Sequence, residues 1–189
     1  MAEGETACPM ESESSCASEG AETELDVVVG LGANLADPRH TLRAAVRELA
    51  TWSPRVALSN IYRTSPVGGP PQPDFLNAAL RLRFRGSPRR LLRRLLETER
   101  RAGRVRVERW GPRTLDLDIL WVSGLTLCDD DLVIPHPRLR ERAFALRPLL
   151  DVAPDANDPR DGAAYARVLA ELGSSGIELL ERGWPVAEV

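Results

Sequence analysis

Apolar and polar residues follow two spacings along this chain, and the order of the segments predicts a fold. Residues 25–31 form a continuous apolar run, typical of a buried central strand, and residues 56–62, 75–85 and 115–122 are predicted to be three further strands. Apolar residues at helical spacing follow Asp37-Pro38 to about Ala50 and Ser87-Pro88 to near Gly103, so each predicted helix begins with an N-cap residue and a proline. The resulting order, β-α-β-β-α-β, predicts an antiparallel sheet with two helices on one face, and residues 135–150 and 165–172 add peripheral helices.

The first 24 residues differ in composition from the rest of the chain. They carry seven Glu and no basic residue, with almost nothing apolar to bury, so we expect a disordered acidic tail over residues 1–24. The remaining residues, 25–189, have the length of a single domain. There is no apolar run of membrane-spanning length and no secretory signal, which predicts a cytoplasmic protein. Three widely spaced cysteines argue against a disulfide framework or a zinc site.

Positive charge is concentrated in one block of the chain. The net charge is −3, yet residues 81–113 contain 13 Arg against three Glu. A block of this kind indicates a polyanionic partner, either nucleotide phosphates or nucleic acid.

Two aspartates in the last predicted strand are the strongest sign of chemistry. Asp116 and Asp118 point to the same face of a strand because side chains alternate along it. Mg²⁺ commonly binds to one or two carboxylates together with substrate phosphates, and Arg109 and Arg113 lie beside this pair in the sequence. The pattern favours phosphoryl-type transfer from a nucleotide. The alternative is that the arginines only pair with the aspartates on a solvated edge.

Other candidates surround these aspartates. A proline- and glycine-rich loop over residues 64–74 could form the wall of a pocket for a flat ligand, and Asn77 could bind the edge of a heterocycle. Phe75 and Trp110 could contact such a ligand or pack in the core. Arg104, Arg106 and Arg109 suit a mobile phosphate clamp, whereas a solvated loop is the alternative.

Two further residues admit both a structural and a functional role. Glu99 lies on the preceding helix, where a surface salt bridge is the plainer interpretation, and His136 lies between two prolines, which suits a ligand contact. The sequence contains no Walker-type glycine-rich loop, so an ATP-using enzyme would have to hold phosphates with metal and arginine.

Several ordered motifs resemble one known family. They are Gly32-x-Asn34, Tyr62-Arg63-Thr64, the segment 72–78 (QPDFLNA), Gly103-Arg104-x-Arg106, the segment 109–120 (RWGPRTLDLDIL), Pro135-His136-Pro137-Arg138-Leu139 and Arg142-Ala143-Phe144. Over residues 27–154 the chain resembles 6-hydroxymethyl-7,8-dihydropterin pyrophosphokinase of folate biosynthesis.

The resemblance implies a ferredoxin-like α+β fold and transfer of pyrophosphate from ATP to the pterin hydroxymethyl group, with release of AMP. It implies two Mg²⁺ ions held by Asp116 and Asp118, and catalytic roles for these aspartates with Arg104 and Arg113. The implied pterin contacts are Thr64, Val67, Phe75, Asn77, Trp110 and Phe144. The implied ATP contacts are Glu99, Arg104, Arg106, Arg109, Arg113, Ile119, His136 and Arg142.

Some positions depart from the family pattern, and one alternative comes from another class of protein. Ser65, Phe75, Leu96 and Asp131 differ from residues common in the family, which affects expected substrate contacts but not the aspartates. The alternative is an RNA-binding ferredoxin-like domain without catalysis, using the arginine block. The aliphatic strands and the acidic pair of this chain argue against that alternative. We expect a monomer that binds neither nucleic acid nor membrane.

Overall fold

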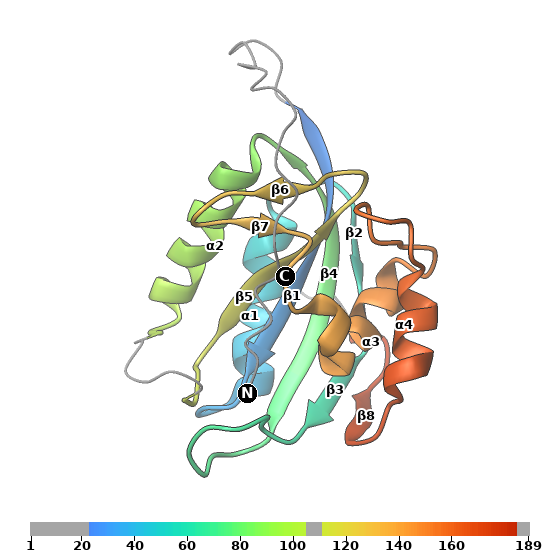
Figure 1. Ribbon diagram of the computed structural model, residues 1–189. Coiled ribbons are helices and arrows are strands. Elements are labelled where there is room, and N and C mark those ends of the chain that lie inside the picture. The colour runs from blue at the N-terminus through green and yellow to red at the C-terminus, as the bar shows by residue number, and fades with distance from the viewer. Residues whose placement is uncertain (1–22, 105–110, 185–189) are drawn as a thin grey trace.

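The computed structural model describes residues 23–104 and 111–184 (Figure 1). Its strands are β1 (Glu24–Ala33), β2 (Val56–Leu58), β3 (Ile61–Thr64), β4 (Phe75–Arg85), β5 (Asp116–Val122), β6 (Leu127–Cys128), β7 (Val133–Ile134) and β8 (Ile177–Glu181). Its helices are α1 (Pro38–Ala50), α2 (Pro88–Arg101), α3 (Ala143–Val152) and α4 (Tyr165–Leu172), with a 3₁₀ turn, η1 (Leu139–Glu141).

The main sheet has the order β5-β1-β4-β3-β8, and β2 also pairs with β4. Every pairing in it is antiparallel, and β1 is central as the apolar run predicts. The register places Gly32 opposite both Asp116 of β5 and Asn77 of β4. Three strands therefore contribute one row of neighbouring residues, Asp116–Gly32–Asn77, and all three residues line the same cavity.

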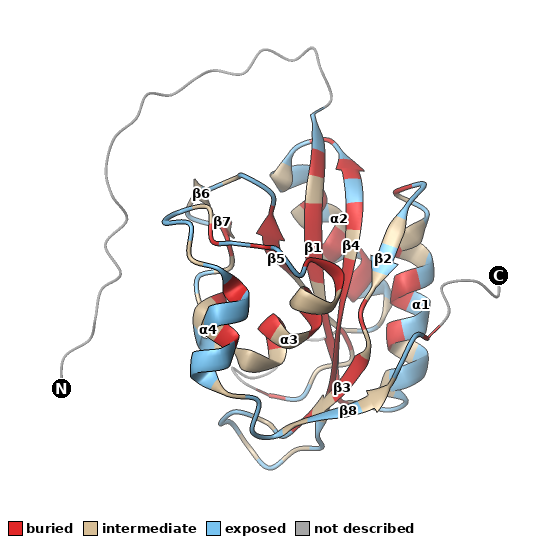
Figure 2. Ribbon diagram, turned by 90° about the vertical axis from the view of Figure 1, so that its right-hand side faces the viewer, coloured by how far each residue is buried: buried red, intermediate tan, exposed pale blue. Residues whose placement is uncertain are grey.

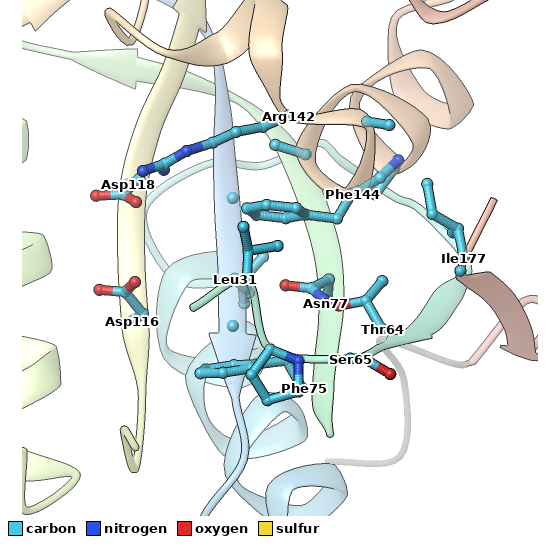
Figure 3. Close-up of a pocket in the computed structure, with 18 of the residues that line it drawn as sticks. Leu31, Thr64, Ser65, Phe75, Asn77, Asp116, Asp118, Arg142, Phe144 and Ile177 are labelled. Carbon is cyan, nitrogen blue, oxygen red and sulfur yellow. Dashed lines mark hydrogen bonds between the residues drawn. The ribbon is translucent and has the colours of Figure 1, made fainter. Parts of the chain in front are cut away.

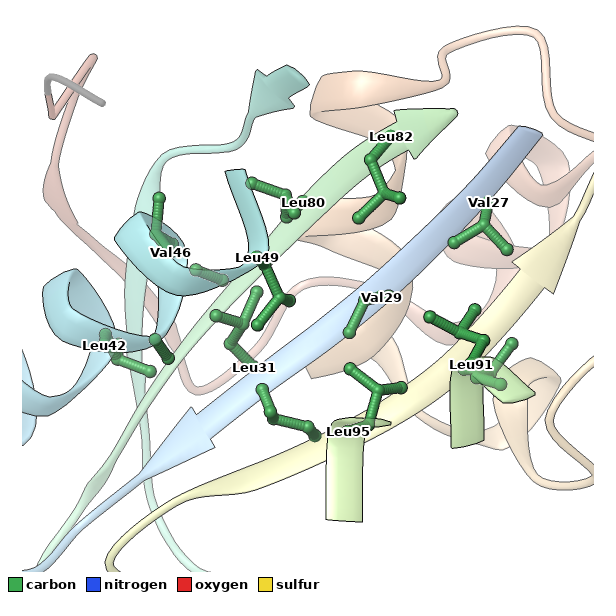
Figure 4. Packing of buried hydrophobic residues seen from close by; sticks show 14 of the residues in the cluster. Val27, Val29, Leu31, Leu42, Val46, Leu49, Leu80, Leu82, Leu91 and Leu95 are labelled. Carbon is green, nitrogen blue, oxygen red and sulfur yellow. The ribbon is translucent and has the colours of Figure 1, made fainter. Parts of the chain in front are cut away.

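Helices α1 and α2 cover one face of the sheet, as the spacing of apolar residues predicts. Asp37 caps α1 by accepting the His40 N–H at 3.0 Å, and Ser87 caps α2 by accepting the Arg90 N–H at 3.2 Å. Figure 4 shows Val27 and Val29 of β1 beneath leucines of both helices, with Leu49 from α1 and Leu95 from α2. These side chains are buried, and they anchor both helices to the sheet.

The opposite face of the sheet is also covered, which the sequence analysis did not predict. Helix α3 lies on it rather than at the periphery (Figures 1 and 2). Leu146 and Leu149 of α3 belong to one buried cluster with Val28 of β1, Ala79 of β4 and Trp121 of β5. Part of this second face is therefore apolar and buried beneath α3, and that part is not open to stack bases as in an RNA-binding domain.

Several elements and one bonding state differ from those predicted. The strand expected over residues 56–62 is two strands, β2 and β3, because Ser59 turns its hydroxyl back to accept the Ala79 N–H at 2.7 Å. Strand β8 was not predicted, and β1 begins at Glu24, inside the expected tail. Cys128 is disulfide-bonded, which contradicts the expectation drawn from cysteine spacing. No helix among residues 23–104 and 111–184 is long and apolar enough to span a membrane.

Candidate active site

A cavity of about 480 Å³ lies beside Asp116 and Asp118. Its walls come from β1, β4 and β5, from the proline-rich loop after β3, and from the start of α3. Residues 175–177, just before and at the start of β8, close its far side. Elements distant in sequence meet here because the antiparallel order places the ends of β3, β4 and β5 on one edge of the fold.

Two glycines form the floor of this cavity. Gly30 and Gly32 of β1 pair with Asp118 and Asp116 of β5. A Cβ atom on Gly30 would lie 3.0 Å from the Leu120 side chain, and one on Gly32 would lie 3.6 Å from Asn77 Oδ1 and 3.7 Å from Asp116 Cβ. The absence of side chains at these positions leaves the space between Asn77 and the aspartates open for a ligand.

The half of the cavity away from the aspartates is apolar with one buried amide. Figure 3 shows the rings of Phe75 and Phe144 on opposite sides of the Asn77 side chain. Asn77 Nδ2 donates to Thr64 Oγ1 at 2.7 Å, which fixes the orientation of an amide that is 8% exposed. Val67, on the loop, is 63% exposed at the rim. Two aromatic rings and an oriented amide suit a flat heterocycle with polar edges.

The other half of the cavity is charged. Arg104 Nη1 lies 2.7 Å from Asp116 Oδ1, and Arg113 forms a second ion pair with Asp116. Arg104 also pairs with Glu99, whose Oε1 accepts the Leu117 N–H at 2.7 Å. Of the two arginines expected beside the aspartates, Arg113 pairs with Asp116, and Arg109 lies outside the described residues. The pairing of arginine with aspartate that the alternative interpretation expects is thus present at Asp116.

Glu99 is a buried residue, so its interpretation as a surface salt bridge is wrong. It is 3% exposed, and burial raises the pKa of its carboxyl group, although the Leu117 N–H and Arg104 oppose that change. It lies behind Asp116, outside the lining of the cavity. Its position indicates that it acts on Arg104 and on β5.

Asp118 and Arg142 both line the cavity, and the side chain of Arg142 extends from the residue before α3 to the carboxylate of Asp118 (Figure 3). Burial and the nearby charge of Asp116 raise the pKa of Asp118 to about 6, although Arg142 lowers it. His136 Nδ1 accepts the Arg138 N–H at 3.1 Å, and burial with the charge of Arg142 lowers the pKa of His136 to about 4. His136 is therefore neutral at pH values near 7, and its Nε2 lies 3.4 Å from Arg142 Nη1.

The expected site residues divide into three groups. Thr64, Val67, Phe75, Asn77, Arg113, Asp116, Asp118, Arg142 and Phe144 line the cavity. Glu99, Arg104 and His136 lie outside the lining of the cavity. Arg104 pairs with Asp116, His136 contacts Arg142, and the charge of Glu99 acts on Asp118. Arg106, Arg109 and Trp110 lie outside the described residues.

Ile119 is an expected ATP contact that belongs to none of these three groups. Its side chain is 5% exposed and lies in the core beneath α1 and α2, on the face of β5 opposite to the two aspartates. Strand alternation requires this, because Asp118 and Ile119 are neighbours in the sequence. The ATP contact of Ile119 stays a prediction.

Asn34 is a residue of the site region whose role the sequence analysis did not identify. It is 3% exposed, its Nδ2 donates to Gln72 Oε1 and Pro73 O at 3.0 Å, and its Oδ1 accepts the Arg113 N–H at 2.8 Å. Asn34 therefore joins the proline-rich loop to the segment before β5. Its place in the Gly32-x-Asn34 motif was the available signal.

Further lining residues also escaped notice: Arg138 and Glu141 around η1, and Ser175, Gly176 and Ile177 before β8. Arg138 belongs to the motif of residues 135–139, but no role was predicted for it. No local pattern marks the other four, because they reach the cavity only through the packing of α3 and the pairing of β8 with β3.

The donor set at Asp116 and Asp118 fits Mg²⁺. Both side chains offer hard oxygen ligands on one face of β5, and the pKa of Asp118 is raised by burial and by the charge of Asp116, which a divalent cation would offset. Within residues 23–104 and 111–184 there is no group of three or more His, Cys, Asp or Glu side chains arranged to hold a metal. Two carboxylates suit an ion that completes its coordination with phosphate and water.

Asp118→Asn should stabilise the metal-free protein at pH values near 7. In the unfolded chain Asp118 ionises near its ordinary pKa of 3.8, whereas in the folded protein its pKa is about 6. The unfolded state therefore binds fewer protons between these values, and stability falls as pH rises through this window. The neutral amide of the variant does not ionise, so the variant should gain in free energy of unfolding above about pH 6 and lose that gain near about pH 4. Chemical denaturation with a chelator present measures it.

Asp26→Asn is the matched control for this effect. A hydrogen bond from Arg81 lowers the pKa of Asp26, so this variant should lose stability near pH values of about 7. If both variants changed the free energy of unfolding in the same direction near pH values of about 7, the raised pKa of Asp118 would be contradicted.

Comparison with known proteins gives a consistent result. The family model described as 7,8-dihydro-6-hydroxymethylpterin-pyrophosphokinase matches residues 28–154. The 2-amino-4-hydroxy-6-hydroxymethyldihydropteridine pyrophosphokinase of Methylorubrum extorquens is 44% identical over 81% of this chain and 97% of its own length. Proteins of the same name from Pseudomonas aeruginosa (43% identical; 82% of this chain and 96% of its own length) and Synechocystis (40% identical; 85% and 80%) are also similar.

Solved structures agree with the fold. A Plasmodium falciparum HPPK-DHPS structure matches 82% of this chain with a TM-score of 0.61 at 14% identity, and this chain spans 45% of that longer one. A triple mutant of the same protein matches with a TM-score of 0.64 over 82% of this chain and 44% of its own length. At this identity the likeness shows the fold alone, and it agrees with the ferredoxin-like α+β prediction.

Proposed function

This chain belongs to the 7,8-dihydro-6-hydroxymethylpterin-pyrophosphokinase family and transfers pyrophosphate from ATP to 6-hydroxymethyl-7,8-dihydropterin in folate biosynthesis, and we propose that its two substrates meet in the cavity beside Asp116 and Asp118. It is a transferase, a 2-amino-4-hydroxy-6-hydroxymethyldihydropteridine diphosphokinase, and ATP is its co-substrate. The RNA-binding alternative is not supported by these relatives.

One observation carries the assignment of the site. The row Asp116–Gly32–Asn77 runs across three paired strands, with a carboxylate at one end, an oriented amide at the other and a glycine between them. A ligand that contacts Asn77 with its polar edge therefore extends over Gly32 toward Asp116. This geometry matches a heterocycle whose reactive arm must reach a phosphate held beside the aspartates.

The apolar half of the cavity suits the pterin. Phe75 and Phe144 would cover the faces of the ring, and Asn77, held by Thr64, would bind its polar edge. Val67 would cover the ring from the loop, and Trp110 is proposed as a further contact. Because Phe75 has no hydroxyl group, this position contributes apolar contact only.

The charged half suits the triphosphate of ATP. Arg113 and Arg142 line the cavity, and we propose that they bind phosphate oxygens together with Arg104, Arg106 and Arg109. His136 and Ile119 remain proposed contacts of the nucleotide. Glu99 would act by holding Arg104 beside Asp116.

The reaction forms one bond and breaks one. The hydroxymethyl oxygen attacks the β-phosphorus, the bond from that phosphorus to the α,β-bridging oxygen breaks, and AMP leaves with the bridging oxygen. The arginines neutralise charge that develops on the bridging and non-bridging oxygens, which is the main requirement of such transfers. The hydroxyl proton must leave as well, and Asp116 is the nearest described carboxylate to the proposed position of the arm.

We propose that Asp116 and Asp118 hold two Mg²⁺ ions. Bound Mg²⁺ would supply further positive charge to the phosphates. We also propose that the enzyme is a monomer with a single domain over residues 25–189. A cytoplasmic location and the absence of nucleic-acid binding stay predictions. Several arginines of the block 81–113 form ion pairs with acidic side chains. Arg81 pairs with Asp26, and Arg89 pairs with Asp129 and Asp131.

The decisive experiment identifies the nucleotide product. Purified protein with ATP, Mg²⁺ and 6-hydroxymethyl-7,8-dihydropterin should release AMP in equal amount to a diphosphorylated pterin, measured by chromatography. ADP as the product would mean transfer of a single phosphoryl group and would overturn the proposed mechanism. Omitting the pterin serves as the control, and AMP should then not accumulate.

A further inference from the structure

Asp158 is a fully buried carboxylate outside the site described above. It lies between α3 and α4, beyond the residues 28–154 that the family model matches, and it is 0% exposed. Arg140 Nε lies 2.8 Å from its Oδ2, and Arg160 Nε donates to its Oδ1 at 2.8 Å. A carboxylate this deeply buried requires such partners, so the three side chains form a tight cluster.

Arg140 belongs to η1, the 3₁₀ turn that borders the active site. In a 3₁₀ turn, residues three apart lie on one face, and Arg138 and Glu141 accordingly both line the cavity and pair at 3.1 Å. Arg140 lies off that face and is not among the lining residues. It instead contacts Asp158 and Asp161 of the loop between α3 and α4.

The turn that carries Arg140 is fixed by the buried side chain of Leu139 and by few hydrogen bonds of its own. It has three residues, and no side chain caps either η1 or the first turn of α3 that follows. Such short turns have weak hydrogen-bond geometry, so tertiary contacts must hold them. Arg142, which faces Asp118, directly follows this turn.

The loop that holds Asp158 is anchored to the strand of the two aspartates. The Asn157 carbonyl accepts Trp121 Nε1–H at 2.8 Å, and Trp121 lies on β5 with Asp116 and Asp118. The loop is also closed on itself, because the Asp158 N–H donates to Ala163 O at 2.9 Å and the Gly162 N–H to Asp158 O at 2.7 Å. The loop therefore connects β5 with η1 through Asp158 and Arg140.

We propose that Asp158 and Arg140 are positioning residues that set the location of Arg142 relative to Asp118, and thereby the affinity for the triphosphate of ATP. The inference rests on the proposed role of Arg142 in binding ATP. Arg140 touches no substrate in this arrangement, and its effect passes through η1.

A double-mutant cycle tests this coupling. The Kd of a non-hydrolysable ATP analogue with Mg²⁺ is measured for the wild type, Arg140→Met, Arg142→Met and the double variant. Arg140→Met should raise the Kd on the order of tenfold, since small displacements of a binding group are costly. In the Arg142→Met background the same change should have an effect below about twofold, because the group through which Arg140 acts is gone. The KM for the pterin should change less than the KM for ATP.

Arg160→Met is the matched control. Arg160 also pairs with Asp158, and its side chain is 38% exposed against 34% for Arg140, but it lies in the loop and not on η1. It should lower thermal stability comparably while changing the Kd by less than about twofold. Asp161→Asn, which removes only the more exposed partner of Arg140, should give a smaller shift in the same direction and serves where Arg140→Met fails to fold.

The outcomes separate this inference from the proposed function. Equal Kd increases in Arg140→Met and Arg160→Met, or an Arg140→Met effect that persists in the Arg142→Met background, would overturn the positioning role. An unchanged Kd in Arg140→Met or in Asp161→Asn would also overturn it. An unchanged Kd in Arg142→Met would instead overturn the proposed ATP contact itself.

Discussion

Asp116→Asn and Asp118→Asn should each lower kcat by about 10³-fold or more, a loss of about 4 kcal/mol in transition-state stabilisation. Each amide keeps the shape of the side chain and removes the charge that would hold Mg²⁺ beside the phosphates. Asp118→Asn should keep the fold, because the wild-type carboxylate is disfavoured there and its pKa is raised to about 6. Activity is measured as AMP release, and folding by circular dichroism and thermal unfolding.

The Mg²⁺ dependence of turnover adds a second readout to this prediction. Residual activity in either variant should need a higher Mg²⁺ concentration for half-saturation. Asp131→Asn is the control, since Asp131 pairs with Arg89 and is absent from the lining of the cavity. Wild-type turnover in either active-site variant would rule out the metal assignment.

Arg104→Met should destabilise the protein by about 3–5 kcal/mol and also abolish most turnover, because it removes one partner of a buried ionic network. The side chains of Arg104 and Glu99 are 8% and 4% exposed, so Glu99 would be left in the interior with only the Leu117 N–H for a partner. The free energy of unfolding is measured by denaturant titration beside the rate of AMP release.

Arg113→Met provides the matched comparison for stability. Arg113 also pairs with Asp116, but its side chain is 36% exposed, so its removal should cost about 1 kcal/mol or less while turnover still falls. The double variant Glu99→Gln/Arg104→Met should regain part of the lost stability, because a neutral amide oxygen still accepts the Leu117 N–H. If Arg104→Met proved as stable as Arg113→Met, the network would not be the buried unit described above.

The parts of the structure that could be predicted from the sequence are those that a short-range rule decides. The start of α1 after Asp37 and of α2 after Ser87 follows from capping within a few residues of the chain. The shared face of Asp116 and Asp118 follows from strand alternation, and the same rule places Ile119 in the core. The proline-rich loop between β3 and β4 follows from residues that cannot continue a strand.

The parts that could not be predicted are those that contacts between distant segments decide. Glu99 is polar and lies on a helix rich in arginine, so local rules favour exposure, yet the close approach of α2 to β5 buries it. Helix α3 was expected at the periphery because its apolar residues do not reveal which sheet face they cover. Strand β8 is short and partly exposed, and it forms only because β3 offers a free edge.

The sequence by itself determined the family, the order of the central elements and the two aspartates on one face, because these depend on ordered motifs, local spacing and capping. Only the tertiary structure decided how Asn77, Gly32 and Asp116 align across three strands, how Glu99 and Arg104 reach Asp116, and how the loop of Asp158 meets η1. The physical reason is that charge pairing and the covering of a second sheet face depend on distances between segments far apart in the chain. Those distances are set by the packing of the whole core, which no local pattern encodes.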